Sequence, residues 1–351
     1  MSQVALPRWS SLGLLVVTLL VLPGAASAIS AQPGTPSVTH GVVVGDVTAR
    51  SAVLWARADR AATLNVTLSG GGHGPVEQVT VEAADDYTGK VVLDRLRPGM
   101  TYDYRVWLSL GARGVAHGPA VRGSFRTPPA HNKAATVKLA FGGDVAGQNV
   151  CRDAQQGFPI MDTIREWEPD IFVGLGDMIY ADNACAAAGR YGNDQLGDLG
   201  VAVDLAGFWE HWRYNRADRA SQRLLRSTSY IGVWDDHEVV NDFGPLTDAP
   251  TAPPYTGAHL LPVGLDAFID YTPIATVPSD SKRLYRSLRW GRHLELFVLD
   301  TRQYAAAVTS WEDAKQWFNF GTLEIAVDGK LIAGIVDTAG RKRFSLELPP
   351  S

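Results

Sequence analysis

The sequence has 351 residues, 46% of them hydrophobic and 20% charged, with a formal net charge of −5. This composition is typical of a globular protein and excludes a disordered chain, and the length favours two domains. The acidic balance offers no general attraction to phosphate backbones, so we expect no stable complex with nucleic acid.

The first 28 residues are typical of an export signal. Arg8 precedes an apolar run at residues 12–22, and Ala26-Ser27-Ala28 fits the small-residue rule for cleavage after Ala28. The run is short for a membrane span and ends at Pro23-Gly24, so we expect no span after cleavage. An uncleaved anchor is the alternative. The predicted location is periplasmic or extracellular.

Residues 36–127 are predicted to form an all-β domain. Runs rich in β-branched and aromatic residues alternate there with turn clusters. The glycine-rich stretch 69–75 lacks the Gly-Lys-Ser/Thr ending of a phosphate-binding loop, so we interpret it as a hairpin loop. Segment 96–106 resembles the corner of fibronectin type III sandwiches, where a turn delivers an alternating aromatic strand into the core. We expect Trp55 to be buried between the two sheets.

A proline-containing linker at 128–133 leads into a second domain, at 136–351, with a strand–helix–strand order that indicates an α/β fold. A β-meander is predicted at 322–348, with Asp328-Gly329 as a tight turn. The hydrophobic patterns predict the following elements: buried strands at 137–141, 170–175, 230–234 and 294–299, a helix at 158–167, and helical structure across 204–226.

Cys151 and Cys185 are the only cysteines in the sequence. Two cysteines can pair in an oxidising compartment. We favour a disulfide that holds two loops together, and a metal-ligand role for either thiol is the alternative.

Three of the predicted strands are each followed by a carboxylate, namely Asp144, Asp177 and Asp236. In open α/β sheets the carboxyl ends of the strands face one crevice, where ligands bind. Acids gathered there repel one another unless cations lie between them. Any one of the three would serve equally well as a helix cap or turn residue. Together they predict a site for hard cations such as Ca²⁺, Mn²⁺ or Fe³⁺.

Three motifs carry a resemblance to a known family. Segment 174–182 contains Gly-Asp-Met-Ile-Tyr, which is similar to the Gly-Asp-x-x-Tyr motif of purple acid phosphatases and PhoD-type alkaline phosphatases. Segment 234–242 contains the Asp-Asp-His-Glu that marks the PhoD branch, and 299–304 matches its Leu-Asp-Thr-Arg-x-Tyr signature. The stretch Phe141-Gly142-Gly143-Asp144 stands where the first metal-binding motif of the superfamily falls. The mature chain therefore resembles the alkaline phosphatase D family of metallophosphoesterases.

The resemblance implies a fold and a metal site. The fold would be an N-terminal all-β, fibronectin-III-like sandwich followed by a calcineurin-like, four-layer αββα metallophosphoesterase domain. Asp177 would bridge two metal ions, Asp144 and Tyr180 would bind one of them, and Asp236 would hold the second. A phenolate ligand favours Fe³⁺, with Ca²⁺ or another divalent cation beside it.

The resemblance also implies a reaction. His237 would act as a general acid or as a hydrogen-bond donor to the leaving oxygen. Arg302 would brace a phosphoryl oxygen, or would instead form a structural salt bridge to Asp300 or another acid. A hydroxide held by the metals would attack phosphorus, as in an exported phosphomonoesterase or phosphodiesterase. We expect a monomer.

The sequence departs from the family pattern near its end. The family closes its site with histidines from late loops, but this chain has no histidine after His293. The simplest interpretation is an internal deletion before the C-terminal strands. His211 and His293 are candidate substitutes that we expect to be structural. Because of this departure, the main alternative is a non-catalytic or truncated family member. Such a protein would bind metal or phosphate without turnover. A third is a cell-surface module in which the sandwich binds a partner.

Overall fold

The computed structural model describes residues 34–70, 76–111, 116–197, 199–242, 257–303, 319–325, 330–337 and 341–348. The predicted export signal, the tip of the glycine-rich hairpin and the Asp328-Gly329 turn lie outside these residues.

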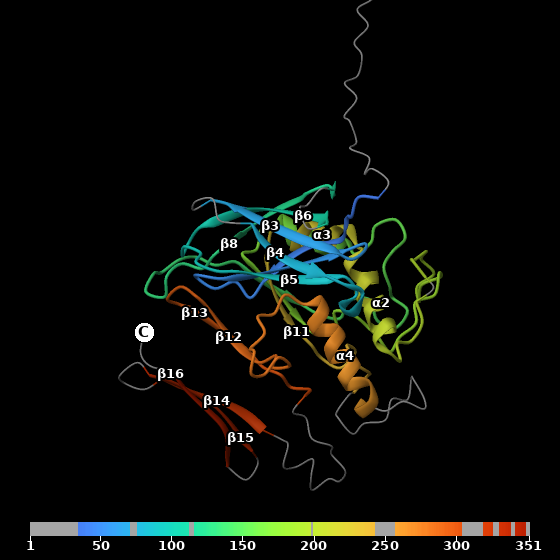
Figure 1. Ribbon diagram of the computed structural model, residues 1–351. Helices are drawn as coiled ribbons and strands as arrows, with labels where there is room; N and C mark the ends of the chain where they lie inside the picture. Colours follow the sequence, from blue (N-terminus) through green and yellow to red (C-terminus); the bar gives the residue numbers. More distant parts are fainter. Residues whose placement is uncertain are drawn as a thin grey trace, which may run out of the picture. The chain divides into compact units, whose positions relative to one another are not determined.

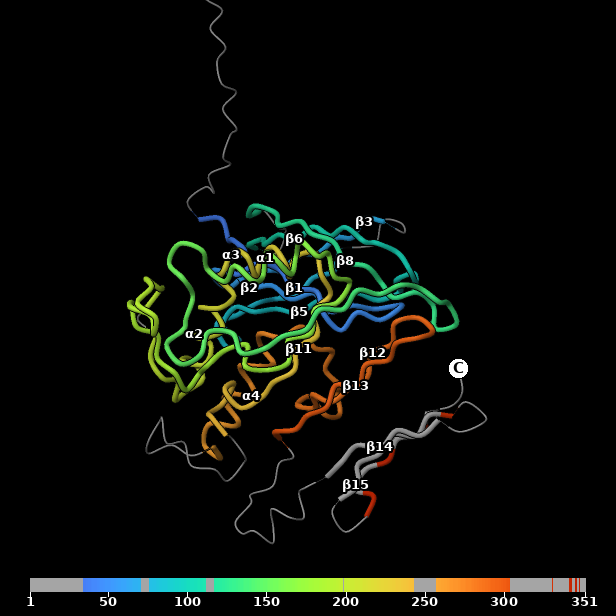
Figure 2. The backbone as a smooth tube through the Cα atoms, turned by 180° about the vertical axis from the view of Figure 1, so that it is seen from behind, coloured from blue at the N-terminus to red at the C-terminus, as the bar shows by residue number. Residues whose placement is uncertain are grey.

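The central feature is a six-stranded mixed sheet that contains strands from both halves of the chain (Figure 1). Its order is β5 (Thr88–Leu93), β2 (Ala52–Ala58), β1 (Val38–Gly45), β11 (Ser229–Val233), β10 (Ile171–Leu175) and β9 (Leu139–Gly142). Strand β1 pairs in parallel with β11, and β9, β10 and β11 are also parallel. Figure 2 shows β1 and β11 close together, although they are far apart in the sequence. Since one sheet runs through both expected domains, their division at 36–127 and 136–351 stays a prediction.

A second, antiparallel sheet completes the sandwich. It consists of β3 (Ala62–Ser69), β4 (Glu77–Val81), β6 (Thr101–Leu110), β7 (Ala116–His117) and β8 (Val121–Arg126). Along β6, Tyr102, Tyr104 and Val106 alternate with exposed residues and enter the core. The hydroxyl of Tyr102 accepts the backbone N–H of Arg97 at 2.7 Å, which is the hydrogen bond of a tyrosine corner. The predicted fibronectin-like sandwich is confirmed.

Trp55 is fully buried, but the expectation that it lies between the two sheets is wrong. It packs against Tyr271, with 5.5 Å between ring centroids, and donates its indole N–H to the carbonyl of Asp270 at 2.7 Å. Both partners belong to α4 (Gly257–Tyr271). Because side chains alternate along β2, Leu54 enters the sandwich core and Trp55 faces the helices.

One face of the central sheet packs on the second sheet of the sandwich, and the helices cover the opposite face. Helix α1 (Pro159–Glu166) confirms the helix predicted at 158–167. The helical segment predicted at 204–226 is divided into α2 (Leu205–Arg216) and α3 (Arg219–Leu225), because the carboxylate of Asp218 caps the amide of Ser221 and starts a new helix. A 3₁₀ turn, η1, spans Ala83–Asp85. None of the described helices is both long and apolar enough to cross a membrane.

The remaining strands form two separate sheets. The hairpin of β12 (Arg286–Trp290) and β13 (Leu294–Val298) packs on β10 and β11 through the cluster that contains Val173, Ile231 and Trp290. Strands β14 (Asn319–Ile325), β15 (Leu331–Asp337) and β16 (Lys342–Leu348) form the predicted antiparallel meander.

Two of the strands predicted to be buried are only partly covered. In β9, Phe141 is 68% exposed, because β9 is the last strand of the central sheet and only β10 pairs with it. In β13, Phe297 is 37% exposed. The strand assignments at 137–141 and 294–299 hold, but the expectation that both are buried is wrong for these side chains.

A buried ionic cluster around Asp86 links the sandwich to the helices. Arg57 binds both oxygens of Asp86, at 2.8 and 3.0 Å, and Arg213 of α2 binds one of them at 2.8 Å. The hydroxyl of Tyr271 also donates to Asp86. Burial raises the pKa of Asp86, but the hydrogen bonds from these three side chains outweigh it and hold the pKa below its usual range.

Asp86→Asn should therefore destabilise the protein by about 3 kcal/mol at pH 7, because it leaves two arginines without their carboxylate. A depressed folded-state pKa contributes stability above the unfolded pKa of about 3.9 and loses it as the pH falls through the folded value. The difference between wild type and variant should therefore shrink below about pH 4. Urea unfolding at both pH values measures it. Asp266→Asn, in the exposed pair with Lys282, should change stability by less than about 0.5 kcal/mol.

Candidate metal and phosphate site

The carboxyl ends of three parallel strands carry the predicted acidic residues. Asp144 follows β9, Asp177 follows β10 and Asp236 follows β11, so they meet at one edge of the sheet. The amide of Val145 donates to the carbonyl of Asp177 at 2.7 Å, which ties the first two loops together. Asp144 and Asp177 adopt positive φ angles of 56° and 52°. Such backbone strain in residues other than glycine is concentrated at functional sites.

Gly176 lets two of these loops approach each other. Its φ is 103°, and a Cβ atom there would lie 2.5 Å from the Cβ of Asp235. Only glycine combines this backbone conformation with so close a contact. The glycine of the Gly-Asp motif therefore sets the spacing of the loops that carry Asp177 and Asp236.

Asp177, Asp236 and His237 form a buried cluster that is able to hold a metal ion, since one ligand atom from each lies within 4.8 Å of the others. Burial and the negative charges of Asp236 and Asp235 raise the pKa of Asp177 to about 6, against the opposing effect of His237. Carboxylates this close repel each other, and a cation between them would relieve that repulsion. The donor set, oxygen with one imidazole, fits a hard or borderline metal ion.

Tyr180 and Asp144 lie beside this cluster. The hydroxyl of Tyr180 donates to the carboxylate of Asp144 at 2.8 Å, and its ring stacks on His237 with centroids 4.0 Å apart. Burial, together with the carboxylates of Asp144 and Asp177, raises the pKa of Tyr180 well above its usual range. All four predicted metal ligands are thus neighbours. Without a cation the phenol keeps its proton, so binding as a phenolate requires a metal to displace it.

The sequence interpretation missed Asp182, which holds His237. The buried carboxylate of Asp182 lies 2.7 Å from Nδ1 of His237 and accepts the amide of Asn241 at 2.9 Å. Burial lowers the pKa of His237, but Asp182, Asp177 and Asp236 outweigh it and raise the pKa overall. Nδ1 is therefore engaged, which leaves Nε2 as the ring nitrogen for a ligand. The available signal was the aspartate two residues after Tyr180.

Glu238, the last residue of the Asp-Asp-His-Glu motif, had no role that the sequence alone predicted. Its carboxylate is completely buried and accepts three backbone amides: Asp177 at 3.1 Å, Met178 at 2.7 Å and Asp235 at 2.9 Å. Burial raises the pKa of Glu238 to about 8, against these amides, which lower it. One side chain thus fixes the backbone on both sides of the cluster.

Arg302 contacts Asp236, a candidate metal ligand, and the adjacent residue Asp235. Its Nε donates to Asp235 at 2.6 Å, and its guanidinium lies 3.6 Å from Asp236. The salt bridge to an acid, which was the alternative to a phosphate-binding role, is therefore present, with Asp235 as the partner. Asp300 instead accepts the backbone N–H of Arg302 at 3.2 Å and the indole N–H of Trp234 at 3.0 Å. The guanidinium therefore brings positive charge to the cluster, whereas Asp300 holds the loop.

The two histidines considered as substitutes lie outside the acidic cluster. His211 is buried, its Nε2 lies 2.8 Å from the carbonyl of Gly200, and burial lowers its pKa to about 4. His293 is exposed in the turn between β12 and β13, at the opposite end of β13 from Asp300. Neither belongs to the cluster of Asp177, Asp236 and His237.

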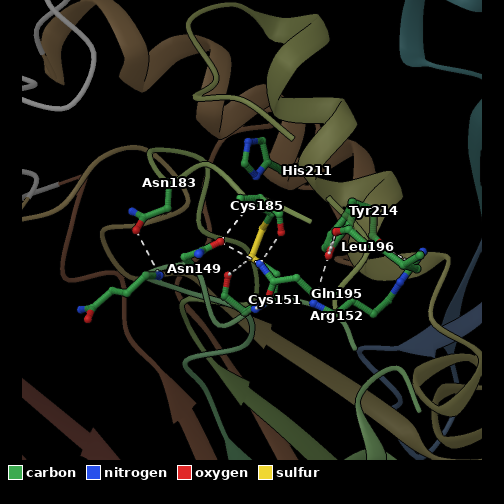
Figure 3. The surroundings of a disulfide bond; sticks show 12 residues. Asn149, Cys151, Arg152, Asn183, Cys185, Gln195, Leu196, His211 and Tyr214 are labelled. Atoms are coloured by element: carbon green, nitrogen blue, oxygen red, sulfur yellow. Dashed lines mark hydrogen bonds between the residues drawn. A yellow bond between two sulfur atoms is a disulfide. The ribbon is translucent and has the colours of Figure 1, made fainter. Parts of the chain in front are cut away.

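The two cysteines form a disulfide, which confirms the favoured interpretation over a metal-ligand role (Figure 3). Around it, Gln195 accepts the amide of Cys151 at 2.9 Å and donates to Asn149 at 2.7 Å. Cys185 lies three residues after Asp182, so the disulfide holds the loop that positions His237.

Replacement of both cysteines by serine should lower the free energy of unfolding by about 3 kcal/mol, because the bond closes a loop with a sequence separation of 34. The measurement is urea unfolding of wild type and double variant. Addition of a reductant should destabilise the wild type and leave the double variant unchanged. Equal stability of the two proteins without reductant would contradict the prediction.

Together, the central sheet and the acidic residues at its strand ends give the fold of the metallophosphoesterase class. The chain matches the family described as "PhoD-like phosphatase" over residues 139–324 and "PhoD-like phosphatase, N-terminal domain" over residues 24–129. It belongs to the PhoD-like phosphatase family, which confirms the resemblance drawn from its motifs.

Individual relatives agree with this assignment. The chain is 25% identical over 309 residues to alkaline phosphatase D of Bacillus subtilis (strain 168), with 80% of this chain and 49% of the relative covered. Its fold is similar to that of PhoD (TM-score 0.64, 20% identity, 83% of this chain and 55% of that one). It is also similar to purple acid phosphatase PPD1 of yellow lupin, Lupinus luteus (TM-score 0.50, 13% identity, 78% and 47% covered). The chain spans about half the length of these relatives.

Proposed function

We propose that this chain is an exported, metal-dependent hydrolase of phosphoric monoesters or diesters. The observation that carries the proposal is the cluster of Asp177, Asp236 and His237, whose ligand atoms lie within 4.8 Å of one another in a chain of a phosphatase family. The guanidinium of Arg302 lies 3.6 Å from Asp236. The alkaline phosphatase named among its relatives supports the same reaction class.

Asp177, with Asp144 and Tyr180, would hold one metal ion, and Asp236 would hold a second. When bound, the ions would supply the attacking hydroxide and neutralise charge on the phosphoryl oxygens. We propose Fe³⁺ beside Tyr180, since a phenolate favours a hard trivalent ion, and Ca²⁺ or another divalent cation at Asp236.

The side chains around the metals have separable tasks. Asp182 holds Nδ1 of His237 and raises its pKa, so His237 keeps a proton to donate from Nε2 to the leaving oxygen. Asp235 holds the guanidinium of Arg302 beside Asp236, where it would face a phosphoryl oxygen. Glu238 fixes the amides of the two loops, so that the ligands are placed before substrate arrives.

Export is supported by the disulfide, because such bonds persist in oxidising compartments. We propose that residues 1–28 are removed and that the mature monomer acts in the periplasm or outside the cell on soluble phosphate esters, without forming a stable complex with nucleic acid.

The test is to purify the chain from residue 29 onward, measure its metals by elemental analysis and assay it with a bis-aryl phosphate. Two metal ions per chain and hydrolysis that a chelator abolishes would support the proposal. The absence of histidines after His293 favours the second candidate, a family member that binds metal or phosphate without turnover. Folded, metal-loaded protein without hydrolysis would establish that alternative.

A further inference from the structure

The outward face of the second sheet of the sandwich carries two arginines directly opposite each other. Arg105 of β6 is the register partner of Arg122 of β8. The residues on either side of Arg105, Tyr104 and Val106, enter the sandwich core, so Arg105 itself points outward. Register partners of an antiparallel pair lie on the same face, so Arg122 points outward beside it. Both arginines are exposed.

Neither of these arginines has an acidic partner among the described residues, whereas a neighbouring arginine has one. Arg126, on the same face of β8, forms an ion pair with Asp170 at 3.3 Å. Arg105 and Arg122 form no such pair within the part of the chain that the structure describes. Like charges directly opposite each other on two strands destabilise a sheet. The facing arginines therefore have an electrostatic cost that a bound anion would relieve.

An aromatic ring holds one of the two guanidinium groups in place. The guanidinium of Arg105 lies 4.8 Å from the ring centroid of Trp107, which is two residues further along β6 and partly exposed. Beside Trp107 on β3, the buried side chain of Asn65 donates to the carbonyl of Trp107 at 3.3 Å and to the hydroxyl of Ser109 at 3.0 Å. Because the ring fixes the planar guanidinium, less side-chain freedom is lost when Arg105 binds an anion.

The surrounding residues favour a ligand that carries hydroxyl groups as well as negative charge. Thr67 of β3 is the register partner of Arg105 on its other side. In the next row, Asp103 lies between Ser69 and Ser124. Hydroxyl side chains both donate and accept hydrogen bonds, as the hydroxyls of a sugar do. The guanidinium groups would meet the acidic groups of such a ligand.

A nucleic acid fits this face less well. Proteins that bind single strands stack successive bases on several aromatic rings. Among the described strands of this sheet, Trp107 supplies the aromatic ring of the outward face, and Arg105 already stacks on it. The formal net charge of the chain, −5, also opposes binding to a phosphate backbone.

We propose that the outward face around Arg105 and Arg122 binds an acidic polysaccharide, with its carboxylates between the two guanidinium groups. The planar fork of arginine matches the geometry of a carboxylate. Binding would retain the exported chain on such a polymer. The inference rests on the export proposed above and does not depend on the proposed hydrolase activity.

The test is titration calorimetry of the chain from residue 29 onward with polygalacturonate, and with neutral dextran as the uncharged comparison. The chain should bind polygalacturonate and not dextran. Arg105→Gln and Arg122→Gln should each weaken binding about tenfold, because each removes one charged hydrogen-bonding group. The matched control is Arg60→Gln, since Arg60 is exposed on the same sandwich but pairs with Asp59 at 3.0 Å. The control should keep the wild-type affinity.

Three results would overturn the proposal: no binding of polygalacturonate, binding that both arginine variants retain in full, or tighter binding of a single-stranded oligonucleotide. Thermal unfolding without polysaccharide adds a separate readout. Arg122→Gln should leave the Tm unchanged or raise it, because it removes the repulsion across the strands. A lower Tm would show that the arginines support the sheet, and would contradict a binding role. Polygalacturonate contains no phosphate ester, so a chain that binds it without hydrolysing a bis-aryl phosphate would support this inference and contradict only the hydrolase.

Discussion

Asp177→Asn should reduce the proposed metal-dependent hydrolysis of phosphodiesters more than about 100-fold, since even residues outside the metal's own ligand set typically cost 10–100-fold. The physical reason is the position of Asp177, between Asp236 and Tyr180 at the centre of the acidic cluster. An amide retains the size of the carboxylate but loses the charge that would hold a cation. The measurement is the rate with a bis-aryl phosphate, together with the metal content of wild type and variant.

A control variant tests whether the effect comes from the loss of a metal ligand or from the loss of any negative charge. Asp94→Asn changes the same chemical group on the exposed surface and should leave both the rate and the metal content unchanged. Burial raises the pKa of Asp177 in the metal-free protein, so its neutralisation should not unfold the chain. An Asp177→Asn variant that keeps its metal and more than a tenth of its activity would refute the assigned role.

Glu238→Ala should lower the free energy of unfolding by about 4 kcal/mol, because it leaves three buried backbone amides without acceptors. Glu238→Gln should cost less, since its one remaining oxygen still accepts amides while its NH₂ group faces a donor. Urea unfolding of the metal-free chains gives both values. Because Asp177 and Asp235 lose their shared anchor, metal affinity should also fall in the alanine variant.

The matched control for this prediction is Glu166→Ala. Glu166 lies at the end of α1, its side chain is 71% exposed, and among the described residues it forms an ion pair only with Arg165, at 3.7 Å. This substitution should change stability by less than about 0.5 kcal/mol. Equal effects at Glu238 and Glu166 would show that the buried carboxylate does not hold the loops.

Much of the fold was predictable because its determinants are local. The alternation of Tyr102, Tyr104 and Val106 predicts a strand with one buried face, and β6 has that pattern. The helix at 158–167 and the meander at 322–348 follow equally from short-range patterns. The position of each acidic residue directly after a strand predicted that Asp144, Asp177 and Asp236 would be neighbours, because parallel strands end at one edge.

The errors concern which face a residue presents to its surroundings. The pattern around Trp55 predicted burial correctly but assigned the wrong side, because the helix that covers Trp55 lies 215 residues away in sequence. The exposed Phe141 likewise depends on its strand being last in the sheet, which no local pattern encodes.

The sequence by itself determined the family, the strand-end acidic residues and the cysteine pair, because motifs and alternation extend over only a few residues. Only the tertiary structure decided what holds the site: Asp182 lies 55 residues from His237, and Glu238 lies 61 residues from the amide of Asp177. Such contacts depend on which strands become neighbours and on how closely their loops approach. That arrangement is set by packing of the whole chain. A sequence motif therefore identifies the candidate ligands but not the groups that position them.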